Sequence, residues 1–333
     1  MFNLGKSTRQ PQQDFAACSG CGLCLLVCPV WRRERSLGLT PLGRAKALQF
    51  GAVAADIAES VESCTLCAAC EPVCPEDIGL VAMTLQLRRQ LVQPAAVRDL
   101  QARMEEQAAQ LPVQTASAAA VLLAGQALRE RPTTLARAAA LLGGTGSMHT
   151  AEDDGADIAL ALETGTTVPA QRLQRFLQPL RAAKTLIVAD GLLLRELQQW
   201  LPKMQITSLG AALSSLAAVR RALRAGDLYV IEPRAYHADY QRLVKYYDAL
   251  RSAAGCAVNL DLQRIAIPAS ARSLPQRLGL AALDDTVQVR WILLGRKITR
   301  VVVESVEDAA AFEQVSHCPV VHLADLADDG TSP

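Results

Sequence analysis

Eight of the ten cysteines in this 333-residue chain fall into two runs of identical spacing. The runs are Cys18-x2-Cys21-x2-Cys24-x3-Cys28-Pro29 and Cys64-x2-Cys67-x2-Cys70-x3-Cys74-Pro75. Ordinary core packing requires no such regularity, whereas metal ligands do, because their sulfur atoms must meet at fixed distances. The N-terminal part of the chain is therefore constrained to a fold that gathers thiols.

The beginning of the chain indicates the redox state of these thiols. Residues Met1–Gln13 are polar and lack the apolar segment of a signal peptide. The longest charge-free stretches, Gln107–Leu128 and Met204–Val219, are interrupted by polar residues and do not predict a membrane span. We therefore expect a cytoplasmic protein without a transmembrane segment, whose thiols stay reduced and do not form disulfides.

The spacing of each run distinguishes between metals. Zinc sites usually combine two Cys-x2-Cys pairs, whereas a third cysteine and a terminal Cys-Pro are typical of ferredoxin [4Fe–4S] runs. In such runs three thiolates hold one cubane and the fourth reaches the neighbouring one. The sequence thus predicts two [4Fe–4S] clusters, with cluster 1 held by Cys18, Cys21, Cys24 and Cys74, and cluster 2 by Cys64, Cys67, Cys70 and Cys28.

Composition excludes one class of partner. The formal net charge is +1 and aromatic residues make up 4% of the chain, so neither a basic surface nor stacking platforms for nucleic acid are expected. Half of the residues are hydrophobic, which is enough to bury a core and excludes general disorder.

The segments around the two runs predict a helical domain over residues 1–110. Apolar residues recur at helical spacing in Leu42–Phe50 and Val53–Val61, and Thr40-Pro41 resembles a helix start. Val81–Gln110 is expected to continue as one long amphipathic helix. Residues 111–155 are expected to form a helical linker region, with a helix over Ala118–Leu142 followed by a loop that begins at Gly143.

Two glycine-containing segments do not predict nucleotide binding. The loop from Gly143 to Gly155 lacks the G-x-G-x-x-G spacing, and Gly5-Lys6-Ser7 has no upstream glycine or strand.

Residues 156–333 show short apolar runs that alternate with helical stretches, which predicts an α/β domain with a mostly parallel sheet. The expected strands are Ile158–Leu162, Thr185–Ala189, Leu228–Ile231, Ala257–Leu260, Thr299–Val303 and Val320–Leu323. The expected helices include Ala170–Ala182, Leu192–Trp200, Leu213–Arg224 and Tyr240–Ala253.

The paired runs and their helical spacer resemble, over residues 14–95, the helical dicluster ferredoxin domain of a known group of iron–sulfur subunits. These are the subunits of glycolate oxidase, anaerobic glycerol-3-phosphate dehydrogenase and heterodisulfide reductase. In several of them the next domain is an α/β module with Cys-Cys-Gly (CCG) motifs. The resemblance implies an α+β multidomain chain in which an N-terminal α-helical dicluster domain precedes a CCG-like α/β domain.

The second half departs from the CCG pattern at its cysteines. Tyr236-His237-Ala238-Asp239-Tyr240 resembles a His-Asp-Pro-Cys stretch, but Tyr240 stands at the cysteine. Ile267-Pro268-Ala269-Ser270 and Val303-Glu304-Ser305 likewise lie where the family has cysteines. A degenerate module that has kept its fold and lost its metal is therefore expected over residues 156–333.

The resemblance implies an electron-transfer subunit, itself non-catalytic, that assembles with a flavoprotein dehydrogenase in a hetero-oligomer. Electrons would pass singly to a quinone pool, reached through a membrane protein, or to a soluble carrier. The chain would be cytoplasmic, with peripheral contact at the inner face of the membrane through its partners. The alternatives are a stand-alone or heterodisulfide-type reductase with a site in the second domain, and a redox-sensing iron–sulfur scaffold.

Other candidate residues have simpler interpretations. Cys256 and Cys318 are expected to be ordinary core thiols, and His237, His317 and His322 core or surface histidines rather than ligands. A basic group near the first run is expected to be a solvated face, with docking of an acidic partner as the alternative. It comprises Arg32, Arg33, Arg35, Arg44 and Lys46.

Overall fold

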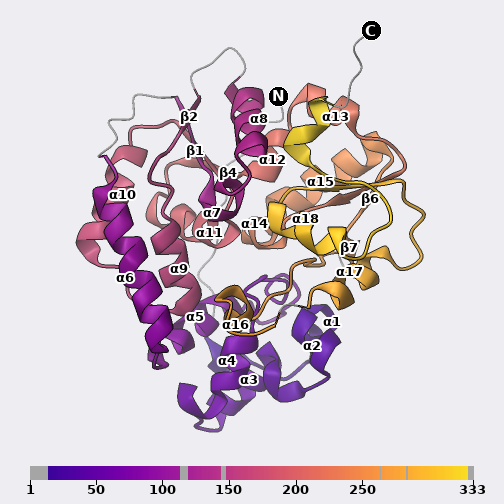
Figure 1. Ribbon diagram of the computed structural model, residues 1–333. Coiled ribbons are helices and arrows are strands. Elements are labelled where there is room, and N and C mark those ends of the chain that lie inside the picture. Colours follow the sequence, from indigo (N-terminus) through magenta and orange to yellow (C-terminus); the bar gives the residue numbers. More distant parts are fainter. Residues whose placement is uncertain (1–13, 113–118, 144–147, 263, 283, 329–333) are drawn as a thin grey trace.

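The computed structural model describes residues 14–112, 119–143, 148–262, 264–282 and 284–328. The cysteine-rich part is built from short helices and lies below two α/β units, which stand side by side (Figure 1). Its elements are η1 (Phe15–Ala17), α1 (Leu23–Val27), α2 (Pro29–Glu34), η2 (Leu37–Leu39), α3 (Pro41–Gln49), η3 (Ala54–Ile57), α4 (Ala58–Ser63) and α5 (Leu80–Gln90).

Local sequence explains where two of these helices begin. Thr40 caps α3, where its side chain accepts a hydrogen bond from the Gly43 N–H, and Pro41 occupies the first turn. Cys28 precedes α2, which begins with Pro29, and the Cys28 carbonyl accepts the Arg32 N–H. The proline after the fourth cysteine of the first run therefore starts a helix that leads the chain away from the thiols.

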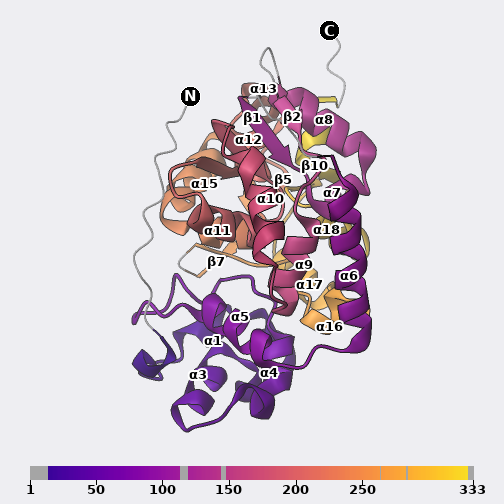
Figure 2. The ribbon, with the colours of Figure 1, turned by 90° about the vertical axis from the view of Figure 1, so that its left-hand side faces the viewer.

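The prediction of one helix over Val81–Gln110 is wrong. The chain forms α5 and then α6 (Ala95–Gln110), separated by a break that ends at Pro94. Proline has no backbone N–H to donate within a helix, so α5 does not continue through Pro94 and α6 begins after it. The two helices both contact α9 (Ala156–Thr164), and α6 runs along one side of the molecule (Figure 2).

The first α/β unit contains a four-stranded parallel sheet of order β2-β1-β3-β4. Its strands are β1 (Ala120–Leu123), β2 (Met148–Thr150), β3 (Thr185–Val188) and β4 (Gln205–Ser208). Its remaining helices are α7 (Gly125–Arg129), α8 (Pro132–Gly143), α10 (Ala170–Leu180), α11 (Gly191–Trp200), α12 (Leu209–Ser214) and α13 (Ala217–Ala222). The central strands β1 and β3 are apolar and almost fully buried, as strands covered on both faces are.

The second unit contains a parallel sheet of order β10-β9-β5-β6 and a short antiparallel pair. Its strands are β5 (Asp227–Val230), β6 (Ala257–Val258), β9 (Arg300–Val303) and β10 (Val320–His322), with β7 (Leu260–Asp261) and β8 (Ile265–Ala266) as the pair. Its helices are α14 (Pro233–Ala238), α15 (Tyr240–Ala254), α16 (Leu274–Arg277), α17 (Thr286–Leu293), α18 (Val306–Glu313) and η4 (Leu323–Asp328).

The two sheets have the same connectivity. Numbered within each unit, both follow the order 2-1-3-4 with all four strands parallel, so that β1, β2, β3 and β4 correspond to β5, β6, β9 and β10. The α/β part therefore consists of two units of one topology.

The structure corrects several expected elements. Ala118–Leu142 is not one helix, because β1 and α7 lie within it, and Ile158–Leu162 is part of helix α9 rather than a strand. Strand β2 lies in the expected loop, and Leu213–Arg224 is divided between α12 and α13. The expected strands near residues 185, 228, 257, 300 and 320 are confirmed.

Some predictions remain untested. Met1–Gln13, including Gly5-Lys6-Ser7, and the glycine-rich residues 144–147 lie outside the described residues. The domain boundaries at residues 110 and 155 remain predictions.

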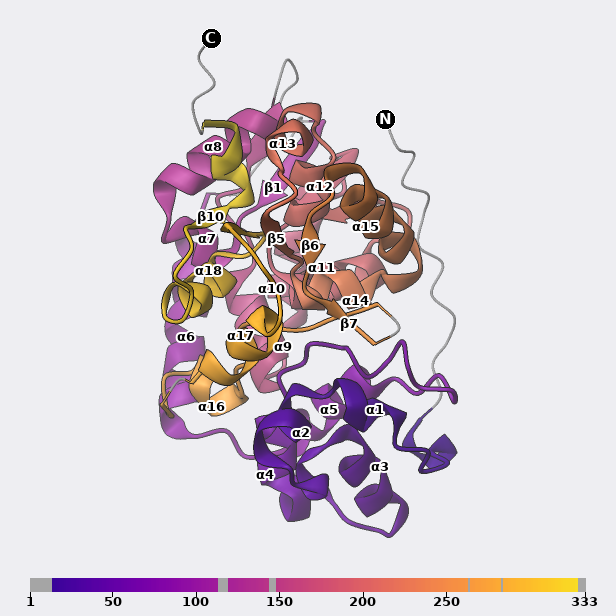
Figure 3. The same ribbon diagram turned by 90° about the vertical axis from the view of Figure 1, so that its right-hand side faces the viewer.

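The dicluster part contacts both α/β units. Helix α5 contacts α9 of the first unit, and α16 of the second unit contacts α4. The β7–β8 pair lies above the cysteine-rich part (Figure 3). Within the part of the chain that the structure describes, no helix is long and apolar enough to cross a membrane.

Candidate iron–sulfur site

Four cysteines from both runs surround the first hollow. Cys18, Cys21 and Cys24 come from the first run and Cys74 is the last cysteine of the second. Ala45, Ile78 and Leu80 complete an apolar wall. Cys21 is exposed and the other three thiols are half-buried, so this hollow lies near the surface.

The second hollow has the complementary composition. Its cysteines are Cys64, Cys67 and Cys70 from the second run and Cys28 from the first. Cys28 and Cys67 are buried, and Leu66, Ala69 and Val81 line the wall. The fourth cysteine of each run therefore lies with the first three of the other.

Both runs have left-handed backbone at the same two positions. These are the second and fourth residues after the first cysteine, namely Gly20 and Gly22 in one run and Leu66 and Ala68 in the other, with φ values of +85°, +79°, +53° and +59°. Glycine adopts this conformation freely, whereas leucine and alanine do so at a cost. The surrounding structure therefore imposes the same loop on both runs, even where the sequence is unfavourable.

Three of the thiols, those of Cys24, Cys28 and Cys70, are in surroundings that disfavour the free thiolate. Burial, together with the neighbouring thiolates of Cys18 and Cys21, raises the pKa of Cys24 to about 11. Burial raises the pKa of Cys28 to about 12, and burial together with Glu71 raises the pKa of Cys70 well above its usual range. Ligation displaces the thiol protons, and the positive charge of iron then stabilises the thiolates that burial disfavours. The donor chemistry thus fits an iron–sulfur cluster in each hollow.

Two buried arginines set the second hollow apart. Burial alone would raise the pKa of Cys64, but Arg44 and Arg88 outweigh this effect and lower it. Arg44 lines the hollow and donates to the Ser60 carbonyl (Nη1–O, 2.7 Å). Arg88 donates to the Cys64 carbonyl (Nη2–O, 2.6 Å) and forms an ion pair with Glu163 of α9. Positive charge therefore accompanies the ligands of this hollow.

The α/β units hold the second run from outside. Arg234 of α14 donates to the Thr65 carbonyl (Nη2–O, 2.7 Å), and Arg195 of α11 forms a two-bond ion pair with Glu71 (2.8 and 2.9 Å). His237 Nε2 accepts the Ala266 N–H, so Nδ1 carries the proton and donates to the Cys67 carbonyl (2.7 Å). Burial lowers the pKa of His237 to about 4, which keeps the ring neutral. The second run is thus part of the boundary with the α/β region.

The first run is held by α3 of its own domain. Lys46 Nζ and Gln49 Nε2 both donate to the Cys18 carbonyl, at 2.8 and 3.0 Å. Gln49 also binds the carbonyls of Phe15 and Ala16.

The expected basic face near the first run is not a single surface. Arg44 is fully buried and Lys46 binds the first run. Arg32 pairs with Asp261, Arg33 with Glu34, and Arg35 lies over the Trp31 ring. The prediction of one solvated face is therefore wrong for Arg44.

Residues 14–78 match a family model described as a 4Fe-4S dicluster domain. These residues form a dicluster domain of the ferredoxin type. It contains eight cysteines between residues 18 and 74 and binds two [4Fe–4S] clusters. Iron–sulfur electron transfer is the function that this domain implies. No curated protein and no solved structure matches the chain.

The other candidate residues lie apart from the dicluster domain or support it. Cys256 is buried in the hydrophobic core of the α/β region, and the Cys318 thiol donates to the Ile298 carbonyl. His322 is buried and caps η4, where its Nδ1 accepts the Ala324 N–H, and His317 is exposed. Tyr240 packs against the hydrophobic cluster that contains Cys67 and Val27.

Sequence reasoning missed the residues that bind the second run. The contacts of Arg195, Arg234 and Glu71 join residues that are separated by 71 to 169 positions in the sequence. No local sequence motif indicates such contacts. Arg88 lies within the segment expected to form an amphipathic helix. Its place on the buried face of α5 is the one available signal, because a charge there requires a partner.

Proposed function

We propose that the chain is the electron-transfer subunit of an oxidoreductase and carries electrons singly between a flavoprotein dehydrogenase and a downstream acceptor. The acceptor is a quinone pool or a soluble carrier. The observation that carries this proposal is the pair of hollows built from shared runs. A [4Fe–4S] cluster supplies one-electron chemistry, and a flavin that oxidises its substrate releases two electrons.

The ligand sets belong to the same proposal. Cys18, Cys21, Cys24 and Cys74 hold cluster 1, and Cys64, Cys67, Cys70 and Cys28 hold cluster 2. The grouping of the thiols around the hollows supports both sets. Cys24 lies in α1 and Cys28 is its C-cap, so one short helix links the two sets and keeps them close.

The α/β region is proposed to be a degenerate CCG-type module that serves as an assembly platform. The repeated 2-1-3-4 topology supports a duplicated module. Tyr240 and Glu304 stand where the family has cysteines, and both are part of well-packed surroundings. We place the complex in the cytoplasm, with contact to the membrane through its partners.

An exposed apolar groove supports docking of the flavoprotein. It is lined by Leu26, Trp31, Leu262, Val287, Trp291 and Leu294, with Arg32, Arg35 and Arg290 around it and Asp261 paired with Arg32. Leu294 is 72% exposed and Trp291 46%. Apolar patches rimmed by charge mark interaction sites, and tryptophan and arginine are enriched in binding hot spots. The groove lies one turn of α2 from Cys28. Because arginines surround the groove, an acidic flavoprotein surface is its proposed occupant.

Anaerobic affinity purification from the native host tests the function. We expect a flavoprotein in stoichiometric amount, and we expect its substrate to reduce both clusters. A cluster-loaded chain that arrives alone, or clusters that the flavoprotein fails to reduce, would overturn the proposal.

Two substitutions test the docking groove. Trp291→Ala should weaken the complex, whereas Phe50→Ala, which removes an 89% exposed aromatic elsewhere, should not. Equal losses in both variants would count against the groove.

A second candidate function, a reductase with a site in the α/β region, is favoured by one observation. A cavity lies between the two α/β units, where ligands bind in folds of this type.

A further inference from the structure

A cavity of about 220 Å³ lies between the two sheets. The carboxyl ends of the strands of both sheets point toward it. Ala124, Ala189 and Leu209, which follow β1, β3 and β4, line one side, and Glu232, Glu304 and His322, at the ends of β5, β9 and β10, line the other. The strand order reverses between β1 and β3, and again between β5 and β9. Such reversal points at carboxyl ends are the places where open α/β sheets bind ligands. The cavity combines both reversal points of the molecule.

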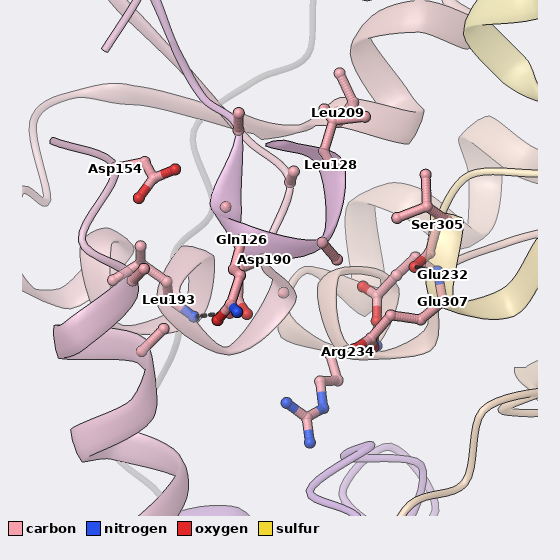
Figure 4. A pocket seen from close by; sticks show the side chains of 18 of the residues that line it. Gln126, Leu128, Asp154, Asp190, Leu193, Leu209, Glu232, Arg234, Ser305 and Glu307 are labelled. Atoms are coloured by element: carbon pink, nitrogen blue, oxygen red, sulfur yellow. Dashed lines mark hydrogen bonds between the residues drawn. The ribbon is translucent and has the colours of Figure 1, made fainter. Parts of the chain in front are cut away.

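Two of the helix N-termini around the cavity, those of α11 and α14, are already occupied by carboxylates of the chain itself. Asp190 accepts the Leu193 N–H at the start of α11 (2.7 Å; Figure 4). Glu232 accepts the N–H groups of Arg234 and Ala235 at the start of α14 (3.0 and 2.6 Å). An anionic ligand would compete with these carboxylates for the same donors at both helix starts. The starts of α11 and α14 therefore do not offer a free anion site.

Negative charge around the cavity exceeds the available positive charge. The two arginines of the lining, Arg234 and Arg277, both pair with Glu163, and Arg277 also pairs with Glu307. Within the described residues, no ion pair is formed by Asp190, Glu232, Glu304 or the neighbouring Asp308. Asp190 and Glu232 are half-buried, and Arg234 offsets part of their charge without forming an ion pair with either. Glu304 and Asp308 are buried, and buried carboxylates are costly unless they bind a proton or a cation.

A buried oxygen without a partner reinforces this excess. Asp308 is 1% exposed and follows Glu307, yet its Oδ2 has no hydrogen-bond partner. Glu304 is also buried, and its carboxylate accepts the hydroxyls of Tyr229 and Tyr247 (2.6 Å each). Burial raises the pKa of Glu232 to about 8 and that of Glu304 to about 7, and the charge of Asp308 adds to both shifts. Without a cation, these groups hold protons near neutral pH.

We propose that this cavity binds a small organic cation, a protonated amine, between the two α/β units. Glu232 and Asp190 would face the ammonium group from the two units, and the exposed Gln126 also lines the cavity (Figure 4). Among the described residues around the cavity, no three histidine, cysteine or acidic side chains converge closely enough to hold a single metal ion. An ammonium group requires no such convergence, because one or two carboxylates and nearby carbonyls satisfy its donors.

The experiment uses the cluster-loaded chain under anaerobic conditions. Ethanolamine and 1,4-diaminobutane are titrated by calorimetry and thermal unfolding, with 1,4-butanediol, succinate and Mg²⁺ as probes of matched size or charge. We expect saturable binding and stabilisation by the amines alone. Binding at neutral pH should also release protons, because the ammonium group displaces those held by the carboxylates, and titrations in buffers of different ionisation enthalpy measure this release.

Charge-neutralising substitutions locate the site. Glu232→Gln and Asp190→Asn should each weaken amine binding by more than about tenfold, because each removes one half-buried charged partner of the cation. Glu106→Gln, at an exposed position of α6, should leave binding unchanged. Asp190→Asn keeps an oxygen that can cap α11, so it remains informative if Glu232→Gln does not fold. Failure of both amines to bind, binding of Mg²⁺ or the diol instead, or unchanged affinity in both variants would overturn the proposal.

Discussion

The two cysteine runs have the same spacing and the same backbone conformation, but they are held in different ways. The first run is bound by Lys46 and Gln49 of its own domain and leaves Cys21 exposed. The second run is bound by Arg195, Arg234 and His237, all from the α/β units. Ligand spacing thus determines the cluster type, whereas tertiary contacts determine how far each cluster is shielded from solvent. The predictions below test this difference, beginning with the largest expected effect.

Substitution of the fourth cysteine of either run should remove the cluster that is held mainly by the other run. Because Cys28 lies in the hollow of the second run, Cys28→Ser should damage the cluster held mainly by Cys64, Cys67 and Cys70. Cys74→Ser should damage the cluster held by the first run. Iron analysis and electron paramagnetic resonance should show that each variant keeps the cluster that the other variant loses. Loss of the local cluster in each variant would contradict the shared-run assignment.

The first cluster should be lost before the second under oxidation or chelation. Cys21 is exposed, whereas Cys28 and Cys67 are 7% and 8% exposed, so reagents reach the first hollow more easily. Graded treatment with ferricyanide and a chelator should produce an intermediate that retains half of the iron. The Cys74→Ser variant, which keeps only the shielded cluster, serves as the spectral reference. Simultaneous loss of both clusters would show that shielding by the α/β units has no effect.

Loss of a nearby cation should lower the reduction potential of the second cluster more than that of the first. Reduction adds negative charge, which a buried cation stabilises more strongly than a half-exposed one. Arg44→Met should therefore lower the second potential by roughly tens of millivolts, and Lys46→Met should change the first by less. Redox titration monitored by electron paramagnetic resonance measures both. Arg44→Lys, which keeps the charge, should restore most of the potential, and an unchanged potential in Arg44→Met would refute the electrostatic explanation.

Sequence predicted the dicluster part well because its chemistry is local. Four ligands within eleven residues leave little freedom, and the apolar strands β3, β5 and β9 are too hydrophobic to lie elsewhere than in a buried sheet. Strand β1 was missed because its four residues, Ala120–Leu123, lie in an alanine- and leucine-rich segment that favours helix equally well. The same ambiguity made Ile158–Leu162, in α9, resemble a strand.

Tertiary contacts account for what the sequence could not predict. The Arg195–Glu71 pair joins residues 124 positions apart, and the carboxylate-lined cavity depends on how two separate sheets face each other. Neither spacing nor periodicity contains that information, because the partners belong to different elements.

The smallest predicted effect concerns the left-handed positions shared by the two runs. Gly22→Ala should destabilise the protein by about 1 kcal/mol, because alanine is strained at this φ. The added Cβ would meet only Leu25 Cδ1 at 3.8 Å, so the loss would reflect backbone strain rather than a clash.

The matched change in the second run should be nearly neutral. Ala68→Gly relieves the same strain but gives up a buried methyl group worth about 0.8 kcal/mol. Anaerobic thermal unfolding of the cluster-loaded variants measures both changes. If Ala68→Gly were as destabilising as Gly22→Ala, packing against the α/β units rather than backbone conformation would dominate at the second run. If instead Ala68→Gly were clearly stabilising, the second run would be the more strained of the two, and its contacts with Arg234, Arg195 and His237 would be what holds it in the shared conformation.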